Sequence, residues 1–371
     1  MDLFINISAS PFTVDRDPRR RELIATKVRQ WHKPFLYCNL VGGQDELVFD
    51  GRSLVFDGDG RLMMEGAAFK EDLIRVDFPL DTAPATAAAT VQREEQLSNA
   101  IVLGLHDYFG KTGHQKAVVG LSGGVDSSLV AALAVRALGS GQVTGIALPT
   151  TYSSSHSEED ARQLATNLGL RFEVLPMESL RRELLQVLDP FYEGTPSGVA
   201  EENLQARIRG TLLMAVANKQ GALLLTTGNK TELALGYATL YGDMSGALAP
   251  IGDLSKSDVY ALCHHLNAQE GRELIPRRVL EKAPSAELRE NQVDPFDYAV
   301  VSPLVDELVL SRATDDELLA KGYDRELIRH IRELLVRAEH KRRQAAPTIR
   351  VTGKAFGSGW RYPIVNMYGP R

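Results

Sequence analysis

Residues 118–139 read "VVGLSGGVDSSLVAALAVRALG", and this stretch sets the fold of the larger part of the chain. An apolar run ends at Ser122, a loop of small residues follows, and an Ala/Leu-rich helical pattern begins after it. A strand, a short loop and a helix in direct succession are typical of parallel sheets, in which ligands bind beyond the carboxyl ends of the strands. We therefore expect the loop "SGGVDSS" to line a ligand site.

Strand and helix patterns alternate from residue 92 onward. Strands are predicted at 116–121, 142–149, 171–176 and 222–229, and helices at 94–113, 125–138, 157–169, 200–221 and 324–344. A capping box formed by Ser157 and Asp160 is expected to open the third of these helices. The alternation predicts an α/β fold, a Rossmann-like doubly wound parallel sheet with helices on both faces.

The first 80 residues show a different pattern, rich in strands and with a single helix. Strands are predicted at 3–8, 34–42, 53–57 and 62–66, a helix at 17–33, and turns at 45–52 ("DELVFDGR") and 57–61. The small, aperiodic stretch "DTAPATAAAT" follows. The expected organisation is therefore a domain at 1–80, a linker at 81–91 and a second domain at 92–371.

Composition narrows the class of protein. The 371 residues are 44% hydrophobic and 24% charged, with a net charge of -6 and no basic tract, which argues against a nucleic-acid partner. No apolar run reaches the roughly 18 residues of a membrane span, and the N-terminus lacks the pattern of a signal peptide. Cys38 and Cys263 show no pairing or metal-ligand spacing, which fits a reducing, cytoplasmic location.

The loop chemistry points to phosphate. Gly123 and Gly124 let backbone N–H groups close around phosphate oxygens, and the helix behind them contributes the positive end of its dipole. Ser122, Ser127 and Ser128 add hydroxyl donors. Asp126 is itself an anion, so its expected role is to hold Mg²⁺ against the phosphates. Since no Gly-Lys-Ser/Thr follows, the loop is not a Walker loop.

This motif resembles the pyrophosphate loop of the N-type ATP pyrophosphatases. Three further stretches, "EENLQARIRG" (201–210), residues 226–262 and "EKAPSAELRENQVDPFDY" (281–298), extend the resemblance to the NAD synthetase family over 92–371. The resemblance implies a ligase with ATP as co-substrate and Mg²⁺ as cofactor. The expected reaction is the amidation of deamido-NAD to NAD through an acyl-adenylate, with AMP and pyrophosphate released and ammonia as the direct nitrogen donor.

The resemblance also assigns roles to individual residues. Asp126, Glu232 and Lys256 are the expected catalytic residues, the first two as Mg²⁺ ligands. The implied ATP contacts are Gly120, Leu121, Ser122, Gly123, Gly124, Val125, Asp126, Ser127, Ser128, Thr227, Lys256 and Ser285. The implied deamido-NAD contacts are Asn203, Arg207, Glu232, Tyr237, Ala238, Thr239, Leu240, His340 and Lys341.

Each assignment has a simpler alternative. Glu232 could be a first-turn acid stabilised by a helix dipole. Lys256 could be an exposed lysine on a helix capped by Ser255, and Arg207 could pair with a glutamate on its own helix. The pair His264–His265 is expected to be structural, because adjacent helix residues point apart.

Residues 1–79 resemble the C-terminal part of a nitrilase-like glutaminase domain, through "NISASPFTVDR" and "VGGQDELVFDGRS". The resemblance implies glutamine contacts by Ser10 and Arg16. The family's Glu-Lys-Cys catalytic set would lie upstream, so we expect a truncated domain and no glutamine hydrolysis by this chain. Leu240 and Ala247 stand where ammonia-only relatives carry Lys and Asp, which favours the glutamine-dependent branch.

Other readings stay open at this stage. GMP synthetase shares the loop, but no purine-site or dimerisation region is visible after residue 280. A tRNA-thiolating enzyme would need catalytic cysteines and a basic face. A non-catalytic nucleotide-binding protein is the third alternative. A homodimer is expected from the family resemblance and from the apolar residues on more than one face of the 200–221 helix.

Overall fold

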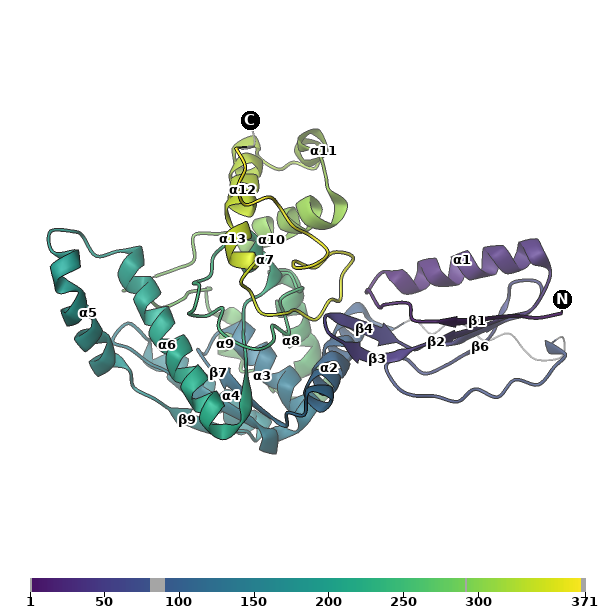
Figure 1. Cartoon of the computed structure of the whole chain (residues 1–371), viewed down its shortest axis with the longest axis horizontal. Coiled ribbons are helices and arrows are strands. Elements are labelled where there is room, and N and C mark those ends of the chain that lie inside the picture. The colour runs from purple at the N-terminus through teal and green to yellow at the C-terminus, as the bar shows by residue number, and fades with distance from the viewer. Residues whose placement is uncertain (1, 81–90, 291, 368–371) are drawn as a thin grey trace. The chain divides into compact units, whose positions relative to one another are not determined.

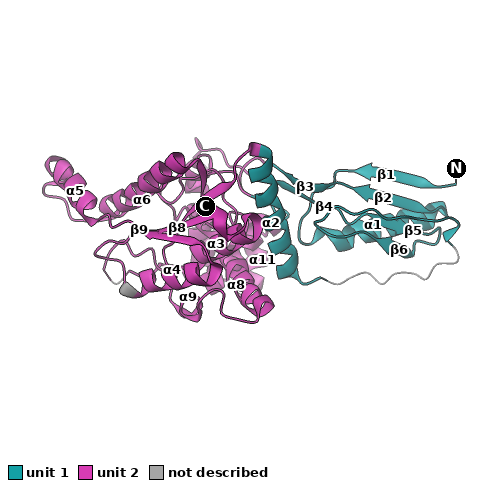
Figure 2. Cartoon of the chain, turned by 90° about the horizontal axis from the view of Figure 1, so that it is seen from below, with its two compact units in different colours: residues 1–111, 349–353 teal, residues 112–348, 354–371 magenta. Residues whose placement is uncertain are grey.

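The computed structural model describes residues 2–80, 91–290 and 292–367. It divides into two compact units, unit 1 with residues 1–111 and 349–353 and unit 2 with residues 112–348 and 354–371 (Figure 2). The predicted linker, apart from Val91, lies outside the described residues. The helix that follows it is grouped with unit 1 for all but its last residue.

The described residues of unit 1 form two small sheets and two helices. Its elements are β1 (Phe4–Ser8), α1 (Arg16–Trp31), β2 (Phe35–Asn39), β3 (Val41–Gln44), β4 (Leu47–Asp50), β5 (Leu54–Phe56), β6 (Leu62–Glu65) and α2 (Arg93–Thr112). One sheet has the order β1-β2-β5-β6, with β1 and β2 parallel and the other pairs antiparallel. The other is the antiparallel hairpin β3–β4.

The hairpin corrects one prediction. The stretch 45–52 was predicted to be a turn, but Leu47–Asp50 is strand β4, paired with β3 from Val41 opposite Asp50 to Gln44 opposite Leu47. The turn is therefore only two residues long. Asp45 takes a φ of 51° there, a conformation that Asp tolerates better than most residues.

Helix α1 covers one face of the larger sheet of unit 1 (Figure 1). Its apolar side places Ile24 and Val28 against Leu54 and Phe56, all less than 9% exposed. This spacing of four residues along the helix puts both side chains on the same face. The apolar face of α1 and the apolar face of the sheet thus form one buried layer.

Unit 2 is built on a four-stranded parallel sheet in the order β10-β7-β8-β9. Its strands are β7 (Lys116–Gly120), β8 (Val143–Ala147), β9 (Arg171–Val174) and β10 (Ala222–Leu225). Val118, in the central strand β7, lies between Thr144 and Leu224 of the neighbouring strands. All four predicted strands are confirmed, with shorter ends than the sequence suggested.

Helices cover both faces of this sheet, as the doubly wound prediction requires. The helical elements are α3 (Val125–Leu138), η2 (Ser140–Gln142), α4 (Ser155–Leu168), α5 (Glu178–Tyr192), α6 (Val199–Gln220), α7 (Lys230–Leu235), α8 (Lys256–Glu270), α9 (Arg277–Glu281), α10 (Tyr298–Asp306), the π-helical η3 (Glu307–Ser311), α11 (Asp315–Ala320), α12 (Arg325–Arg337) and α13 (Glu339–Arg342). Ile208 and Ala217 of α6 pack against Val118 and Leu224 of the sheet. Helix α3 packs on β7 and β8 and also against α8. None of the described helices combines the length and apolarity needed to cross a lipid bilayer.

Two predicted helices differ from the structure, one at its start and one by a break. The third helix does not open at a Ser157–Asp160 capping box. It starts at Ser155, and the N-cap is Ser154, which accepts a hydrogen bond from the Ser157 backbone N–H. The predicted helix at 324–344 is broken at Ala338 into α12 and α13. Helices α5, α9, α10 and α11 were not predicted from the sequence.

The buried position of α3 gives a stability prediction. Leu129 is completely buried in this helix, so Leu129→Ala should lower the free energy of unfolding by about 2–5 kcal/mol through lost burial and a cavity. Urea unfolding followed by circular dichroism measures this loss. Val187→Ala, at a site 69% exposed on α5, is the control and should stay within about 0.5 kcal/mol. Equal effects of the two substitutions would contradict the placement of α3 in the core.

Candidate functional site

The loop between β7 and α3 is organised by its own serines. The Ser122 hydroxyl accepts a hydrogen bond from the Gly124 N–H at 3.2 Å and lies 3.1 Å from the Ser127 hydroxyl. The Ser128 hydroxyl donates to the Gly124 carbonyl at 2.8 Å, so it serves the first turn of α3. Gly123 has a φ of 74°, a left-handed conformation that glycine adopts without steric cost.

Gly123 is also required by a close approach. A Cβ atom on this residue would lie 2.3 Å from the carbonyl oxygen of Ser157, in the first turn of α4. The phosphate loop, defined here as residues 121–128, therefore packs directly against the N-terminal end of α4. The glycine that the sequence assigned to ligand binding has this second, purely steric reason to be glycine.

Three charged side chains meet where this loop enters α3. The Lys256 ammonium is 2.5 Å from Asp126 Oδ2 and 3.3 Å from Glu232 Oε1, and its side chain is only 3% exposed. The second oxygen of Asp126 accepts a hydrogen bond from the Asn229 amide at 2.8 Å. Lys256 also lies over the ring of Tyr298, 5.2 Å from its centroid. The alternative that Lys256 is an exposed surface lysine is therefore wrong.

Glu232 combines a local role with a long-range one. It forms a capping box at the start of α7, in which its Oε2 accepts from the Asn229 N–H and its own N–H donates to the Asn229 side chain. The alternative of a first-turn helix acid is thus correct as a description of the local structure. Its other oxygen faces Lys256, a contact that α7 alone could not create.

The charge balance of this cluster favours a cation. Burial, and next the neighbouring Asp126 carboxylate, raise the pKa of Glu232 to about 8. Burial by itself would lower the pKa of Lys256, but Asp126 and Glu232 outweigh it and raise that pKa. Two carboxylates face one ammonium, so the cluster carries one excess negative charge only when Glu232 is ionised, and the raised pKa of Glu232 means that this form is disfavoured unless a further cation is bound. Hard oxygen donors with excess negative charge are what Mg²⁺ takes from a protein when phosphates supply further ligands.

A metal site built by protein side chains alone is not seen. Within the ranges 2–80, 91–290 and 292–367, no three His, Cys, Asp or Glu residues are grouped to hold an ion. Two carboxylates plus phosphate oxygens remain a suitable donor set, since Mg²⁺ sites of this kind often use one or two carboxylates.

A cavity collects most of the predicted ATP residues. Its lining includes Gly120, Leu121, Ser122, Gly124, Val125, Asp126, Ser127, Thr227, Glu232, Tyr237, Lys256 and Ser285. Ser285 comes from the loop after α9, where its hydroxyl donates to the Gln292 carbonyl at 2.6 Å. The cavity thus joins the carboxyl ends of β7 and β10 to the loop after α9, which lies more than 100 residues beyond β7 along the chain.

The other predicted deamido-NAD residues are held together beside this cavity. Asn203 accepts from the Thr239 hydroxyl at 2.7 Å, and Arg207 donates to the Leu240 carbonyl at 3.2 Å. Lys341 donates to the carbonyls of Gly236 and Ala238, at 2.8 and 2.7 Å. These contacts fix the backbone of segment 236–240. Arg207 does not pair with a glutamate of its own helix, as the simpler alternative proposed; the carbonyl of Leu240 is its partner.

Three predicted residues lie in other surroundings. His340 is exposed, with its Nδ1 2.8 Å from the Arg337 carbonyl. Ser10 and Arg16 belong to unit 1, where the Ser10 N–H donates to Asn39 and Arg16 donates to the Pro11 carbonyl. For all three the structure gives local partners, and their ligand contacts stay predictions.

The residue-by-residue prediction missed several side chains that line the cavity, among them Arg209, Asp243, Lys282, Glu287 and Asp294. All five lie in or beside the three stretches that carried the resemblance, so their location was the available signal. Burial raises the pKa of Asp243 to about 6, and this carboxylate accepts from the Thr239 N–H at 2.6 Å. Asp294 accepts hydrogen bonds from the hydroxyls of Tyr237 and Tyr298.

Comparison with known proteins identifies the family. The sequence profile of NAD synthase matches residues 97–345. The chain belongs to the NAD synthase family. It is 45% identical to a glutamine-dependent NAD(+) synthetase of Synechocystis, over 100% of this chain and 67% of that protein, and 40% identical to one of Thermotoga maritima, over 99% and 70%.

A solved NAD synthase structure agrees with the fold. The glutamine-dependent NAD+ synthetase from Acinetobacter baumannii, in complex with ADP, superposes with a TM-score of 0.74 at 36% identity, covering 100% of this chain and 69% of that one. The α/β architecture predicted from the sequence is therefore that of the family. Membership of this family makes the chain a carbon–nitrogen ligase of NAD biosynthesis. It favours NAD synthase over the alternatives of a GMP synthetase or a tRNA-thiolating enzyme.

The charged cluster leads to a test of catalysis. Asp126→Asn and Glu232→Gln each replace a carboxylate of the cluster with an uncharged amide of nearly the same size. Glu232→Gln also keeps an oxygen that can accept the hydrogen bond of the α7 cap. Each should lower the rate of AMP release at saturating Mg²⁺ by well over tenfold, because the remaining oxygens bind a cation and position the phosphates less well.

Asp297→Asn is the matched control for these variants. Asp297 caps α10 through the Ala299 N–H, outside the cavity, and asparagine caps helices equally well. It should retain the wild-type rate, and circular dichroism should show all three variants folded. Near-normal rates in both cluster variants would refute the assignment of Asp126 and Glu232.

Proposed function

We propose that this chain makes NAD from deamido-NAD, ATP and ammonia, with the cavity around Asp126, Glu232 and Lys256 as the place of reaction. The observation that carries the proposal is the convergence of these three side chains at the end of a phosphate loop. Family membership independently supports NAD synthesis with ATP. The ADP bound by the Acinetobacter baumannii relative supports an adenine nucleotide as the ligand of the loop.

The reaction consists of two displacements. A carboxylate oxygen of deamido-NAD attacks the α-phosphorus of ATP, the bond from that phosphorus to the bridging oxygen breaks, and pyrophosphate leaves. Ammonia then attacks the acyl carbon of the adenylate, the carbon–oxygen bond to AMP breaks, and the nitrogen loses a proton to give the amide. The first step brings two anions together, so the site must offset their repulsion.

The residues of this chain divide that task. Backbone N–H groups of the loop and the N-terminus of α3 bind the leaving pyrophosphate. The ammonium of Lys256 stabilises charge at the phosphates and is held in place by two carboxylates. Asp126 and Glu232 would hold Mg²⁺, which when bound supplies a positive charge that polarises phosphoryl oxygens. Segment 236–240, fixed by Asn203 and Lys341, would line the deamido-NAD side.

The nitrogen donor is a finer point of the proposal. The relatives are named glutamine-dependent, and amide hydrolysis on a nitrilase-like fold requires a thiolate nucleophile. Cys263 is fully buried, and burial raises the pKa of its thiol well above the usual value. Cys38 is exposed on strand β2. The buried Cys263 thiol is therefore not in a setting that activates it as a nucleophile.

The location and assembly of the protein follow the same proposal. A cytoplasmic enzyme is supported by the spacing of Cys38 and Cys263, which fits a reducing compartment. A homodimer is supported by helix α6, whose Met214 and Val199 remain 37% and 69% exposed, although other apolar residues of the helix pack on the sheet.

The nitrogen source is tested by supplying each donor separately. With ATP and deamido-NAD, the 371-residue chain should form NAD from ammonium salts, at a rate that rises with pH as more NH₃ becomes available, and should form none from glutamine. Coupling to alcohol dehydrogenase measures NAD. Glutamine-driven synthesis that disappears in Cys38→Ser would overturn this part of the proposal.

Pyrophosphate release from ATP only in the presence of deamido-NAD separates the proposed enzyme from a non-catalytic nucleotide-binding protein.

The assembly prediction is tested by sedimentation equilibrium. At micromolar concentration the chain should behave as a dimer, because a second copy that covers the exposed apolar side chains of α6 removes their surface from water. Met214→Glu should shift the equilibrium toward monomer, while Lys219→Glu near the end of the same helix should not. A monomer at all concentrations would be the contrary result.

A further inference from the structure

A second lysine, Lys282, lines the same cavity. The basic side chains among the lining residues are Arg209, Lys256 and Lys282. Lys256 is held by two carboxylates, so a further cation beside the loop would add to the positive charge that Lys256 offers a nucleotide. A triphosphate carries several negative charges, and cations that contact it directly bind it more strongly than neutral donors do. Lys282 is therefore of interest as a further phosphate ligand.

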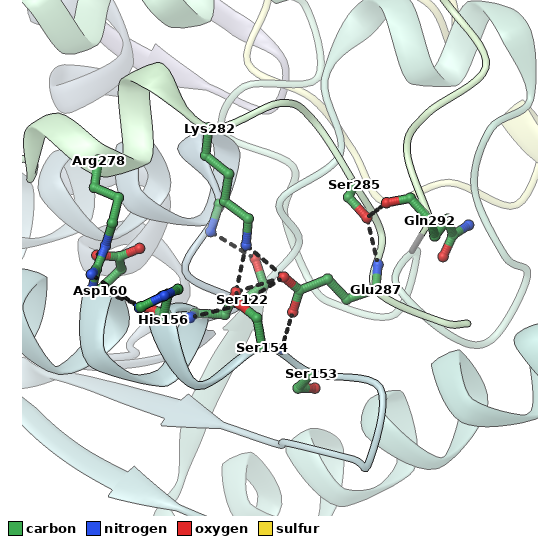
Figure 3. Close-up of polar contacts among 12 residues, drawn as sticks. Ser122, Ser153, Ser154, His156, Asp160, Arg278, Lys282, Ser285, Glu287 and Gln292 are labelled. Carbon is green, nitrogen blue, oxygen red and sulfur yellow. Dashed lines mark hydrogen bonds and ion pairs between the residues drawn. The ribbon is translucent and has the colours of Figure 1, made fainter. Parts of the chain in front are cut away.

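Lys282 directly follows helix α9, and its ammonium is held at the first turn of α4. It donates to the Ser157 hydroxyl at 2.6 Å and to Glu287 Oε1 at 2.5 Å. Glu287 in turn accepts from the Ser157 hydroxyl at 2.7 Å and from the Ser154 N–H at 3.3 Å. Figure 3 shows the side chains of Lys282 and Glu287 pointing toward each other from the two ends of a short loop.

This position is next to the phosphate loop. The carbonyl of Ser157 is the group that a Cβ on Gly123 would strike at 2.3 Å. The residue that receives the Lys282 ammonium is therefore in direct contact with the glycine at the centre of the loop. The side chains of both Lys282 and Glu287 stay partly accessible, at 30% and 17% exposure, so an entering ligand can reach them.

The geometry points to Lys282 as a phosphate-binding residue of the ATP site, and to Glu287 as the anion that occupies its ammonium when no nucleotide is bound. A carboxylate and a phosphate are both oxygen anions, so a β- or γ-phosphate oxygen can replace Glu287 as the partner of the ammonium without leaving the charge unpaired. This inference rests on the proposed function, since it assigns a residue to the triphosphate of the same ATP site.

A purely structural role for the pair makes a different prediction. If the Lys282–Glu287 contact only fastens the loop after α9 to α4, loss of either partner should have the same effect. If Lys282 binds phosphate, loss of the lysine should weaken ATP binding, whereas loss of the Glu287 charge removes a competitor for the ammonium. The opposite responses to the two substitutions distinguish the roles.

Arg278 provides a control for the fastening role. It lies on α9 and ties that helix to α4 through Asp160 at 2.7 Å and Glu159 at 3.0 Å (Figure 3). It is absent from the lining of the cavity. Arg278→Gln therefore loosens the same pair of helices without removing a cation from the ATP site.

The experiment measures nucleotide affinity by calorimetry on the full chain. The ligands are an ATP analogue with a methylene between the α- and β-phosphorus, and AMP, which lacks the β- and γ-phosphates. Lys282→Met should weaken binding of the analogue by at least tenfold and leave AMP binding unchanged, and Lys282→Arg should recover most of the loss. Glu287→Gln should bind the analogue as tightly as the wild type or more tightly, and Arg278→Gln should bind it equally.

Two results would overturn the inference. One is equal weakening by Lys282→Met and Glu287→Gln, which would make the pair a structural fastening. The other is unchanged affinity for the analogue in folded Lys282→Met and in Lys282→Gln, a second neutral variant. Both are separate from a failure of the proposed function, which would appear as a wild-type chain that binds no analogue or releases no pyrophosphate from ATP with deamido-NAD.

Discussion

The ion cluster of Lys256 with Asp126 and Glu232 is the interaction on which the candidate site depends. Its members come from three segments: Asp126 and Lys256 are 130 positions apart in the sequence, and Glu232 and Lys256 are 24 apart. Each would be costly to bury alone, and removing one partner from a buried ion pair typically destabilises a protein by about 3–5 kcal/mol. The fold must therefore bring all three together, and this requirement links the phosphate loop, α7 and α8.

All three side chains of the ion cluster lie in the first turns of helices. Asp126 is in the first turn of α3 after Gly124, Glu232 in the first turn of α7, and Lys256 begins α8. The positive end of a helix dipole stabilises the two carboxylates and disfavours the ammonium. The lysine is therefore held there by its partners rather than by its own helix. Several helix N-termini directed at one cavity also make it an environment for anions.

Backbone carbonyls hold the segment that is proposed to line the deamido-NAD site. Arg207 and Lys341 reach segment 236–240 through carbonyl oxygens, so these cations position the chain by contacts that need no acidic partner. In the proposed function the charged cluster would act on the phosphates, and the carbonyl contacts would give the neighbouring segment a defined shape. The two parts of the site are thus stabilised by different kinds of interaction.

The sequence by itself determined the features that depend on neighbouring residues: the parallel α/β fold, the phosphate loop between β7 and α3, and the Ser255 cap of α8. It identified Glu232 and Lys256 only through resemblance, because a capping glutamate or a first-turn lysine looks the same in an exposed helix. Tertiary structure decided that Lys256 is buried, since its partners are distant in sequence. It also decided that Ser154 caps α4, while Ser157, placed as the cap by local pattern, receives Lys282 and contacts Gly123. Local sequence sets backbone preferences over a few residues, whereas burial and charge pairing depend on segments that only the folded chain brings into contact.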